Sequence, residues 1–319
     1  YRMSQSSVQS FACDMDYRLP EDRWPHQVSG FHDTTNAIAS GKRRVVFTSP
    51  TGGGKTLCMT DLIEWASSEW LGSSLYTCRR MLFEQTSKVL TKVGIEHGFR
   101  AAGYPTALLR DVQICMTQSE HAAVYRRKKR QLHNSSIVMI DELHQQGGEM
   151  MKDIIEGHYN SGASIIGITA TPIDLMGEWD TLVIAGTNSS LRKCGALVPA
   201  ITYCPDAPDI RHIKKYRVGE DLTDKENHKV MMRPGVFGRV FKHWQNLNPQ
   251  RLPTILFGPD VTGSIYFAEQ FYKNGVRSAH IDAKQIWYNG DYIDSNDEER
   301  ERILKMTETG EVEVLCNRF

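Results

Sequence analysis

Residues 49–56 read Ser-Pro-Thr-Gly-Gly-Gly-Lys-Thr, follow the apolar run at residues 44–48 and precede a helical pattern. A strand that ends in glycines lets successive backbone N–H groups converge on one anion, and the next helix adds the positive end of its dipole. Lys55 supplies charge for the outer phosphates of a nucleotide, and the Thr56 hydroxyl is the expected protein ligand of Mg²⁺. Ser49 departs from the usual pattern, which has glycine there. The run predicts a loop that binds the triphosphate of a nucleotide, formed by Gly52, Gly53, Gly54, Lys55 and Thr56.

The 319 residues suffice for two compact domains, with 40% hydrophobic and 24% charged residues as in ordinary globular proteins. Lys plus Arg and Asp plus Glu both number 38, so any surface for a polyanion must be local. The clearest basic run, residues 126–130, is more often a solvated helix face than a binding patch. Seven scattered cysteines argue against a disulfide framework and a zinc site. We find no signal peptide or membrane-spanning run, so the expected location is the cytoplasm or nucleoid.

Short apolar runs alternate with helical patterns between about residues 44 and 168. This alternation is typical of an α/β fold with a parallel sheet and crossover helices. Ligands of such sheets lie beyond the carboxyl ends of the strands, where the phosphate loop falls. We expect strands at residues 45–48, 74–78, 112–116, 137–140 and 165–169, and helices at residues 55–69, 81–93, 120–132 and 149–159.

Prolines at positions 199, 205 and 208 and the polar stretch 217–229 predict a connector with little regular structure. A second α/β series follows, with a long loop at residues 283–296 whose aromatic side chains could stack on bases but more often pack on their own domain. These aromatics are Trp287, Tyr288 and Tyr292. We expect strands at residues 254–257, 279–281 and 312–316, and helices at residues 237–244, 264–274 and from a Ser295/Glu298 capping box to about 309.

The last expected strand, from Val312 to Cys316, runs almost into the end of the sequence. An apolar strand of this kind belongs inside a parallel sheet, and a half-built sheet would leave its hydrogen-bonding edge bare. We therefore expect either that the natural protein continues past Phe319 or that a protein partner covers this edge. Tyr1 is not the product of a start codon, which indicates that the amino end is also cut.

Two carboxylates follow the apolar strand at residues 137–140, in the run Asp141-Glu142-Leu143-His144. A protein that catalyses phosphoryl transfer mainly places metal, nucleophile and positive charge around the terminal phosphate. Asp141 fits the metal ligand, and Glu142 fits the group that polarises the attacking water. The alternative is an acidic turn that merely caps the sheet. Another strand ends in Thr169-Ala170-Thr171-Pro172, which by itself is an ordinary turn signal.

The phosphate loop, the DExH box and the TATP segment, in this order, resemble the superfamily 2 helicases and translocases. The residues of the individual motifs are similar to those of the RadD-like and XPB-like branch of DNA helicases within this superfamily. Residues 23–27 are similar to the R-P-Y-Q element of that branch, which implies that Gln27 contacts adenine, although Trp24 stands in the usual arginine place. Residues 78–85 resemble motif Ia and residues 112–119 the next strand-contacting motif. The implied nucleic-acid contacts, mainly to phosphates, are Arg79, Arg80, Thr117 and Gln118.

Those four residues also have structural interpretations, because arginines solvate helix starts and threonines cap helices. The resemblance further implies that His144, Thr169 and Thr171 relay the nucleotide state to the strand-binding face. Residues 191–199 are similar to the exit segment between lobes, and residues 254–257 resemble motif IV. The implied fold has two RecA-like lobes with parallel sheets flanked by helices: residues 1–200, a linker at 201–233 and an incomplete second lobe at 234–319. Motifs V and VI, the latter the source of an arginine finger, are absent, so we expect weak ATP binding and poor turnover.

The resulting hypothesis is an ATP-hydrolysing motor that moves along or unwinds nucleic acid, most simply DNA, with RNA as an option. Its cofactors would be ATP and Mg²⁺, the metal held by Thr56 and Asp141, with Lys55, Asp141 and Glu142 as the catalytic residues. Two alternatives stay open: a nucleotide-gated clamp or scaffold that holds DNA without unwinding it, and the motor subunit of a restriction-type complex.

Overall fold

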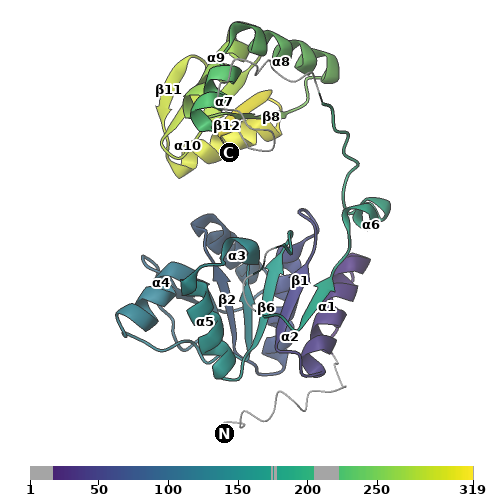
Figure 1. The fold of residues 1–319 in the computed structure, drawn as a ribbon, viewed down its shortest axis with the longest axis vertical. Coiled ribbons are helices and arrows are strands. Elements are labelled where there is room, and N and C mark those ends of the chain that lie inside the picture. Colours follow the sequence, from purple (N-terminus) through teal and green to yellow (C-terminus); the bar gives the residue numbers. More distant parts are fainter. Residues whose placement is uncertain (1–16, 174, 176–177, 205–222, 319) are drawn as a thin grey trace. The chain divides into compact units, whose positions relative to one another are not determined.

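The computed structural model describes residues 17–173, 175, 178–204 and 223–318. The chain divides into two compact units, with the boundary between Ala200 and Ile201 (Figure 1). The expected connector at residues 201–233 lies largely outside the described residues. Its described carboxyl-terminal part is helical, because Thr223 and Glu226 form a capping box at the start of a helix, α7 (Asp224–Met231). The expectation of little regular structure is wrong for that part.

The first unit contains a seven-stranded sheet in the order β3-β4-β2-β5-β6-β1-β7, and all of its described strand pairs are parallel. This confirms the expected α/β fold. The centre of the sheet is buried on both faces, which explains why β5 reads as an unbroken apolar run. The strands are β1 (Arg44–Thr48), β2 (Ser73–Thr77), β3 (Gly98–Arg100), β4 (Val112–Met116), β5 (Ile137–Ile140), β6 (Ser164–Thr169) and β7 (Thr181–Ile184).

Helices cover both faces of this sheet (Figure 1). One apolar cluster joins α1, α2 and α3 to one face, and alternate strand residues such as Met139 point into it. A second cluster joins α5 to the other face, where Val138 and Ile140 point. The helices are α1 (Pro25–Ala39), α2 (Lys55–Ser68), α3 (Arg80–Lys92), α4 (Thr117–His121), the π-helix η2 (Ala122–Arg126), the 3-10 helix η3 (Leu143–Gln145), α5 (Glu149–Asn160) and α6 (Asn188–Lys193).

The second unit contains a five-stranded sheet in the order β11-β10-β9-β12-β8. Strands β8, β12 and β9 are parallel, and β10 and β11 extend the sheet as an antiparallel hairpin. Its elements are β8 (Thr254–Gly258), β9 (Ser278–Ile281), β10 (Gln285–Tyr288), β11 (Asp291–Asp294), β12 (Val314–Arg318), α7, α8 (Pro234–Leu247), α9 (Val261–Lys273) and α10 (Asp297–Glu308).

The expectation of a bare strand edge between Val312 and Cys316 is wrong. The strand there, β12, begins at Val314 and pairs with β8 on one side and β9 on the other. The crossover order places the last strand in the middle of the sheet, so both of its edges are hydrogen-bonded. The edges of this sheet are β8 and β11.

The segment at residues 283–296, expected to be a loop, folds as the β10–β11 hairpin. Asn289 and Gly290 turn the chain with φ of +52° and +93°, the left-handed values that a tight hairpin turn requires. Trp287 is buried in the core of its own unit, as expected of the more common alternative, whereas Tyr292 is exposed. The expected helix at 120–132 is confirmed only as far as Arg126: the helical segment starts earlier, at Thr117, and α4 gives way to η2, which ends at Arg126.

Candidate nucleotide and nucleic-acid site

The order of the first sheet brings the predicted motifs to one continuous edge. Strands β4, β2, β5, β6 and β1 are consecutive neighbours, and each motif follows the carboxyl end of one of them. Strand β6 lies between the strand of the phosphate loop and the strand of the DExH box. It is bonded to both: Ser49 N–H donates to the Thr169 carbonyl (3.3 Å), and His144 Nδ1 lies 2.9 Å from Thr169 Oγ1. The two motifs are therefore held at a fixed separation by the strand between them.

The backbone of the phosphate loop has the conformation of an anion-binding site at the start of α2. Gly52 and Gly54 have φ of +81° and +79°, which glycine adopts without strain. Gly54 is the N-cap of α2, and this helix start has neither a side-chain cap nor an acidic residue in its first turn. Lys55 and Thr56 open the helix. The uncapped N–H groups and the helix dipole therefore face the same place as the Lys55 charge.

The first turn of α1 is hydrogen-bonded to this loop. Gln27 is buried; its Nε2 donates to the Gly53 carbonyl at 3.3 Å, and its Oε1 accepts from the Trp24 N–H at 3.0 Å. His26 Nε2 lies 2.9 Å from the same Gly53 carbonyl. The position of Gln27 beside the loop is compatible with a contact to a nucleotide base, and that role stays a prediction.

Asp141 ends β5 as a nearly buried carboxylate. Its Oδ1 accepts the Glu142 N–H at 2.9 Å. Burial raises the pKa of the Asp141 carboxyl, and the charge of Glu142 raises it further, whereas the Glu142 N–H and the nearby Lys55 lower it. The contribution of Lys55 indicates that its charge lies within electrostatic reach of the DExH carboxylate. A carboxylate whose charge is opposed by its surroundings is stabilised by a cation, so its environment fits a metal ligand.

The donor set also fits Mg²⁺ carried on a nucleotide. This ion is usually held by one or two carboxylates together with substrate phosphates and water. Within the described part of the chain, no group of three or more His, Cys, Asp or Glu side chains could hold a metal without such help. Asp141 and the partly exposed Thr56 would be the protein ligands.

Glu142 and His144 form a tight turn after β5. Glu142 has φ of +48°, an unusual left-handed value for a residue with a side chain and one that costs about 1–3 kcal/mol. Its Oε2 lies 3.5 Å from His144 Nδ1. Thr169 Oγ1 in turn accepts the Thr171 N–H at 3.0 Å. The three residues predicted to relay the nucleotide state, His144, Thr169 and Thr171, are thus joined in one hydrogen-bonded series.

Sequence reasoning missed Gln146, which lies behind this turn and is buried. Its Oε1 accepts the Thr117 hydroxyl at 2.6 Å, and its Nε2 donates to the Asp141 carbonyl at 2.6 Å and the Tyr76 carbonyl at 3.5 Å. Gln146 therefore links the ends of β4, β2 and β5. A second Gln in an acidic turn carries no motif, so only the structure could identify it.

The predicted nucleic-acid contacts differ in accessibility. Arg79, Arg80 and Gln118 are exposed at the carboxyl ends of β2 and β4. Arg80 shares hydrogen bonds with Glu84 (3.2 Å) and the Tyr104 hydroxyl (3.1 Å). Thr117 is buried, and its hydroxyl also reaches the Thr77 carbonyl at 3.3 Å. Its side chain faces the interior rather than a ligand, because the start of α4 packs against β2.

A second missed feature is the ion pair between Arg23 and Asp61. Arg23 Nε donates to Asp61 Oδ2 and Arg23 Nη2 donates to Asp61 Oδ1, each at 2.8 Å, and both side chains are buried. This bidentate pair fastens the segment of Gln27 to α2, directly behind the phosphate loop. A charge pair 38 residues apart has no periodic signature in the sequence.

A parallel sheet of this order, with its phosphate loop and DExH turn, defines a helicase-type RecA-like domain. Residues 22–174 match the family model described as Type III restriction enzyme, res subunit. The chain therefore contains a ResIII-type helicase-family domain. The assignment to a RadD-like or XPB-like branch stays a prediction.

Three solved helicases share the fold at low sequence identity. They are the DUF1998 helicase MrfA bound to DNA (TM-score 0.60, 15% identity, 95% of this chain and 45% of that chain), the Pyrococcus furiosus Hef helicase domain (0.56, 12%, 90% and 85%) and Mycobacterium smegmatis Lhr bound to single-stranded DNA and AMP-PNP (0.51, 16%, 91% and 39%).

A curated relative is the 51.5 kDa protein of Lactococcus phage (isolate 7-9), which is 23% identical over 277 residues. The match covers 84% of this chain, and the chain spans about half the length (53%) of that relative. Among the described helices, none has the length and apolar character that crossing a bilayer requires.

Proposed function

We propose that this chain is the ATP-dependent motor part of a helicase or translocase acting on nucleic acid, with DNA as its substrate class. The observation that carries the proposal is the pairing of the phosphate loop with Asp141 across β6, fixed by the Ser49 and His144 bonds to Thr169. Support for DNA comes from the similar folds of MrfA and Lhr, which are described as bound to DNA.

The roles of the residues follow from their positions. The N–H groups of residues 52 and 54–56 and the Lys55 ammonium would bind the phosphates, whereas the Gly53 N–H donates to the Pro50 carbonyl at 2.9 Å; Gln27 would contact the base. Mg²⁺ held by Thr56 and Asp141 would neutralise charge on the phosphates when nucleotide is bound. Glu142 would orient the attacking water and accept its proton. Arg79, Arg80 and Gln118 would contact the phosphate backbone without reading sequence.

The test separates nucleotide binding from turnover. Lys55→Ala should abolish the rise in melting temperature produced by ATP with Mg²⁺. Glu142→Gln should keep that rise and lose phosphate release, because its amide cannot accept the proton. A retained shift in the first variant, or full turnover in the second, would refute these assignments.

A translocating motor of a restriction-type complex is the second candidate, favoured by the description of the matching family model. Displacement of the strand of a forked duplex indicates unwinding. Displacement of a triplex-forming strand without fork unwinding indicates duplex translocation. A chain that binds DNA in a nucleotide-dependent way and does neither is the clamp or scaffold.

A further inference from the structure

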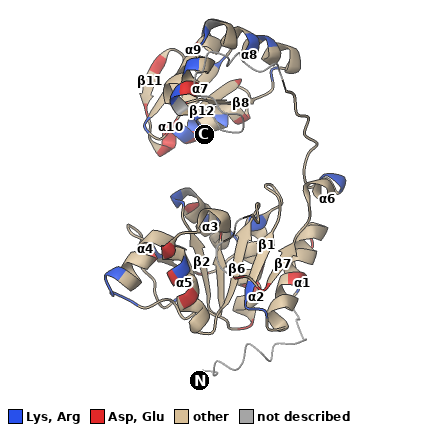
Figure 2. Ribbon diagram, viewed as in Figure 1, with Lys and Arg blue, Asp and Glu red and all other residues tan. Residues whose placement is uncertain are grey.

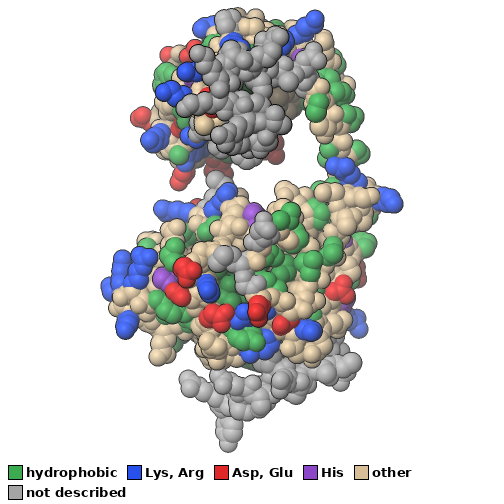
Figure 3. All heavy atoms as spheres, viewed as in Figure 1, with side chains coloured by type: hydrophobic (Ala, Val, Ile, Leu, Met, Phe, Trp, Pro, Cys, Tyr) green, Lys and Arg blue, Asp and Glu red, His purple; other side chains and the backbone are tan. Residues whose placement is uncertain are grey.

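The end of η2 and the turn after it carry four consecutive exposed cations that the proposed function does not use. They are Arg126, Arg127, Lys128 and Lys129, here called the basic tip. No ion pair to a carboxylate is found for any of them among the residues that the structure describes. Lys and Arg residues follow one another in the ribbon at this turn (Figure 2) and gather at the α4 edge of the first unit (Figure 3).

Two backbone hydrogen bonds to η2 hold the basic tip in a turn. Arg127 N–H donates to the Ala122 carbonyl at 2.9 Å, and Lys129 N–H donates to the Ala123 carbonyl at 2.8 Å. Lys128 adopts a left-handed φ of +47° between them. On the other side, the Tyr125 hydroxyl donates to the Asp153 carbonyl at 2.7 Å. Four like charges are thus presented on a fixed turn.

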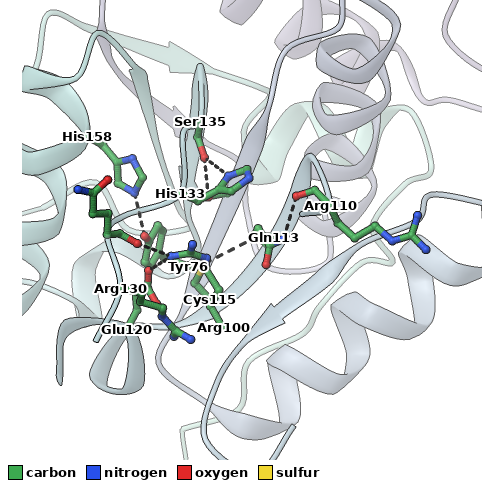
Figure 4. A network of polar contacts seen from close by, with 12 residues as sticks. Tyr76, Arg100, Arg110, Gln113, Cys115, Glu120, Arg130, His133, Ser135 and His158 are labelled. Atoms are coloured by element: carbon green, nitrogen blue, oxygen red, sulfur yellow. Dashed lines mark hydrogen bonds and ion pairs between the residues drawn. The ribbon is translucent and has the colours of Figure 1, made fainter. Parts of the chain in front are cut away.

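The next residue, Arg130, anchors the tip to a buried charge. Arg130 Nε and Nη2 donate to Glu120 Oε2 at 2.9 and 2.5 Å, and Arg100 pairs with the other oxygen of the same carboxylate (Figure 4). Glu120 is fully buried. Burying such a charge is costly unless it is well paired, and removing one partner of such a pair is strongly destabilising. This anchor therefore fixes where the tip emerges.

Clustered like charges without acidic partners repel one another and are stabilised by a polyanion. Each lysine or arginine that neutralises a phosphate releases a condensed counterion, which favours binding at low salt. Four such groups on a rigid turn match a backbone of regularly spaced phosphates better than a single anion. An acidic protein or a lipid surface would also supply negative charge, but Gln118, the exposed nucleic-acid contact predicted in α4, lies in the same helical segment as the tip.

That segment gives the geometric link. α4 starts at Thr117, next to Gln118, and runs directly into η2, which ends at Arg126. Ten residues of α-helix span about 15 Å, and because five of these ten are in a π-helix, the segment spans at most four or five base-pair steps of about 3.4 Å. We propose that the basic tip is a second phosphate-binding site, which holds nucleic-acid backbone about five steps beyond the contacts at the sheet edge. This inference rests on the proposed function, because the sheet edge must bind the same nucleic acid.

The test compares the salt dependence of DNA binding in matched variants. In the tip variant, residues 126–129 are all changed to Gln. The control has the same net charge but scattered changes: Lys42→Gln, Lys225→Gln, Lys242→Gln and Lys305→Gln. Binding to a fluorescent DNA duplex is measured by anisotropy at several salt concentrations. A charge-preserving pair, Arg126→Lys with Arg127→Lys, checks that charge rather than side-chain shape matters.

Each duplex phosphate contact contributes about 0.9 to the slope of log K against log salt. We expect the tip variant to lose about 2–4 from the magnitude of that slope and to bind at least about tenfold more weakly. The difference in slope between the tip variant and the wild type should vanish when the DNA probe is shortened by about five base pairs, because the shorter duplex cannot reach the tip. The scattered control and the Arg→Lys pair should keep the slope.

Three outcomes would overturn the inference. An unchanged slope in the tip variant, with normal binding by the wild type, rejects the tip and leaves the proposed function standing. An equal loss in the scattered control shows a general charge effect. Loss of binding to anionic phospholipid vesicles with an unchanged DNA slope identifies a lipid surface instead. Failure of the wild-type chain to bind any nucleic acid rejects the proposed function itself.

Discussion

Replacing Gln146 by Leu tests whether this buried amide holds the two halves of the site together. The change removes the acceptor of the Thr117 hydroxyl and the donor to the Asp141 carbonyl, both at 2.6 Å. Thr117 keeps its longer bond to the Thr77 carbonyl (3.3 Å), so the Asp141 carbonyl bears most of the loss. Each lost hydrogen bond costs about 1 kcal/mol, and each buried group left without a partner costs about 1–3 kcal/mol.

The upper end of that range is reduced by a neighbouring cavity of about 150 Å³, which Gln146 lines together with Leu143 and Trp179. A cavity of this size admits water, which replaces part of a lost hydrogen bond. We therefore expect Gln146→Leu to lower the free energy of unfolding by about 2 kcal/mol. Gln145→Leu is the matched control, because Gln145 is exposed, and it should change stability by less than about 0.5 kcal/mol.

The assay is urea unfolding of four chains: wild type, Gln146→Leu, Thr117→Val and the double variant. The two residues are in direct contact, so their effects should not add. A coupling energy of about 1 kcal/mol is expected, since the cycle isolates one neutral hydrogen bond. Equal stabilities of the Gln146 and Gln145 variants, or additive effects within about 0.3 kcal/mol, would refute this reasoning.

Two further predictions follow from single residues. Gly54→Ala should destabilise the chain by at least about 1–2 kcal/mol. Gly54 has φ of +79°, and a Cβ there would lie 2.1 Å from Gln27 Nε2. An unchanged urea unfolding curve would contradict this prediction. Burial lowers the pKa of His158 to about 3, aided by the nearby charges of His133 and Arg100. Below about pH 6.5 the unfolded chain binds a proton on His158 that the native chain does not bind. The free energy of unfolding should therefore decrease as the pH is lowered, by up to about 1.4 kcal/mol per pH unit. His158→Gln should flatten that slope between pH 6.5 and 5, and equal slopes would contradict the assignment.

The first unit was predictable because its signals are local. An apolar run followed by glycines, or by Asp141 and Glu142, marks a buried strand and its ligand-binding end without reference to the rest of the chain. β4 and β5 begin and end where they were expected, at residues 112–116 and 137–140. β3 has three residues and β7 four, too few to give a periodic signal, and the sequence did not reveal them.

The second unit shows what local signals leave undecided. The apolar strand β12 was expected from its residues, but its place between β8 and β9 depends on the crossover order, which no single segment encodes. The β10–β11 hairpin had a usable signal in Asn289-Gly290, the commonest two-residue hairpin turn, which the strand assignment overlooked. The N-cap of α10 is Asn296, one residue later than the expected Ser295, because Asn296 Oδ1 accepts the Glu299 N–H at 2.8 Å. Two neighbouring residues that can both cap are not distinguishable from their types.

The turn after β5 explains how several of the proposed roles can depend on so few residues. Glu142 adopts a left-handed backbone, and the 3-10 helix η3 follows, so successive side chains leave the turn in different directions. His144 reaches Thr169 at the end of β6, on the side of the phosphate loop, and Gln146 reaches Thr117 at the start of α4. A displacement of this turn would stretch contacts on both sides at once, because β5 lies between β6 and β2. A bound nucleotide that displaces Asp141 would therefore act on the start of α4 through Gln146, without any contact between the nucleotide and a nucleic acid bound at α4.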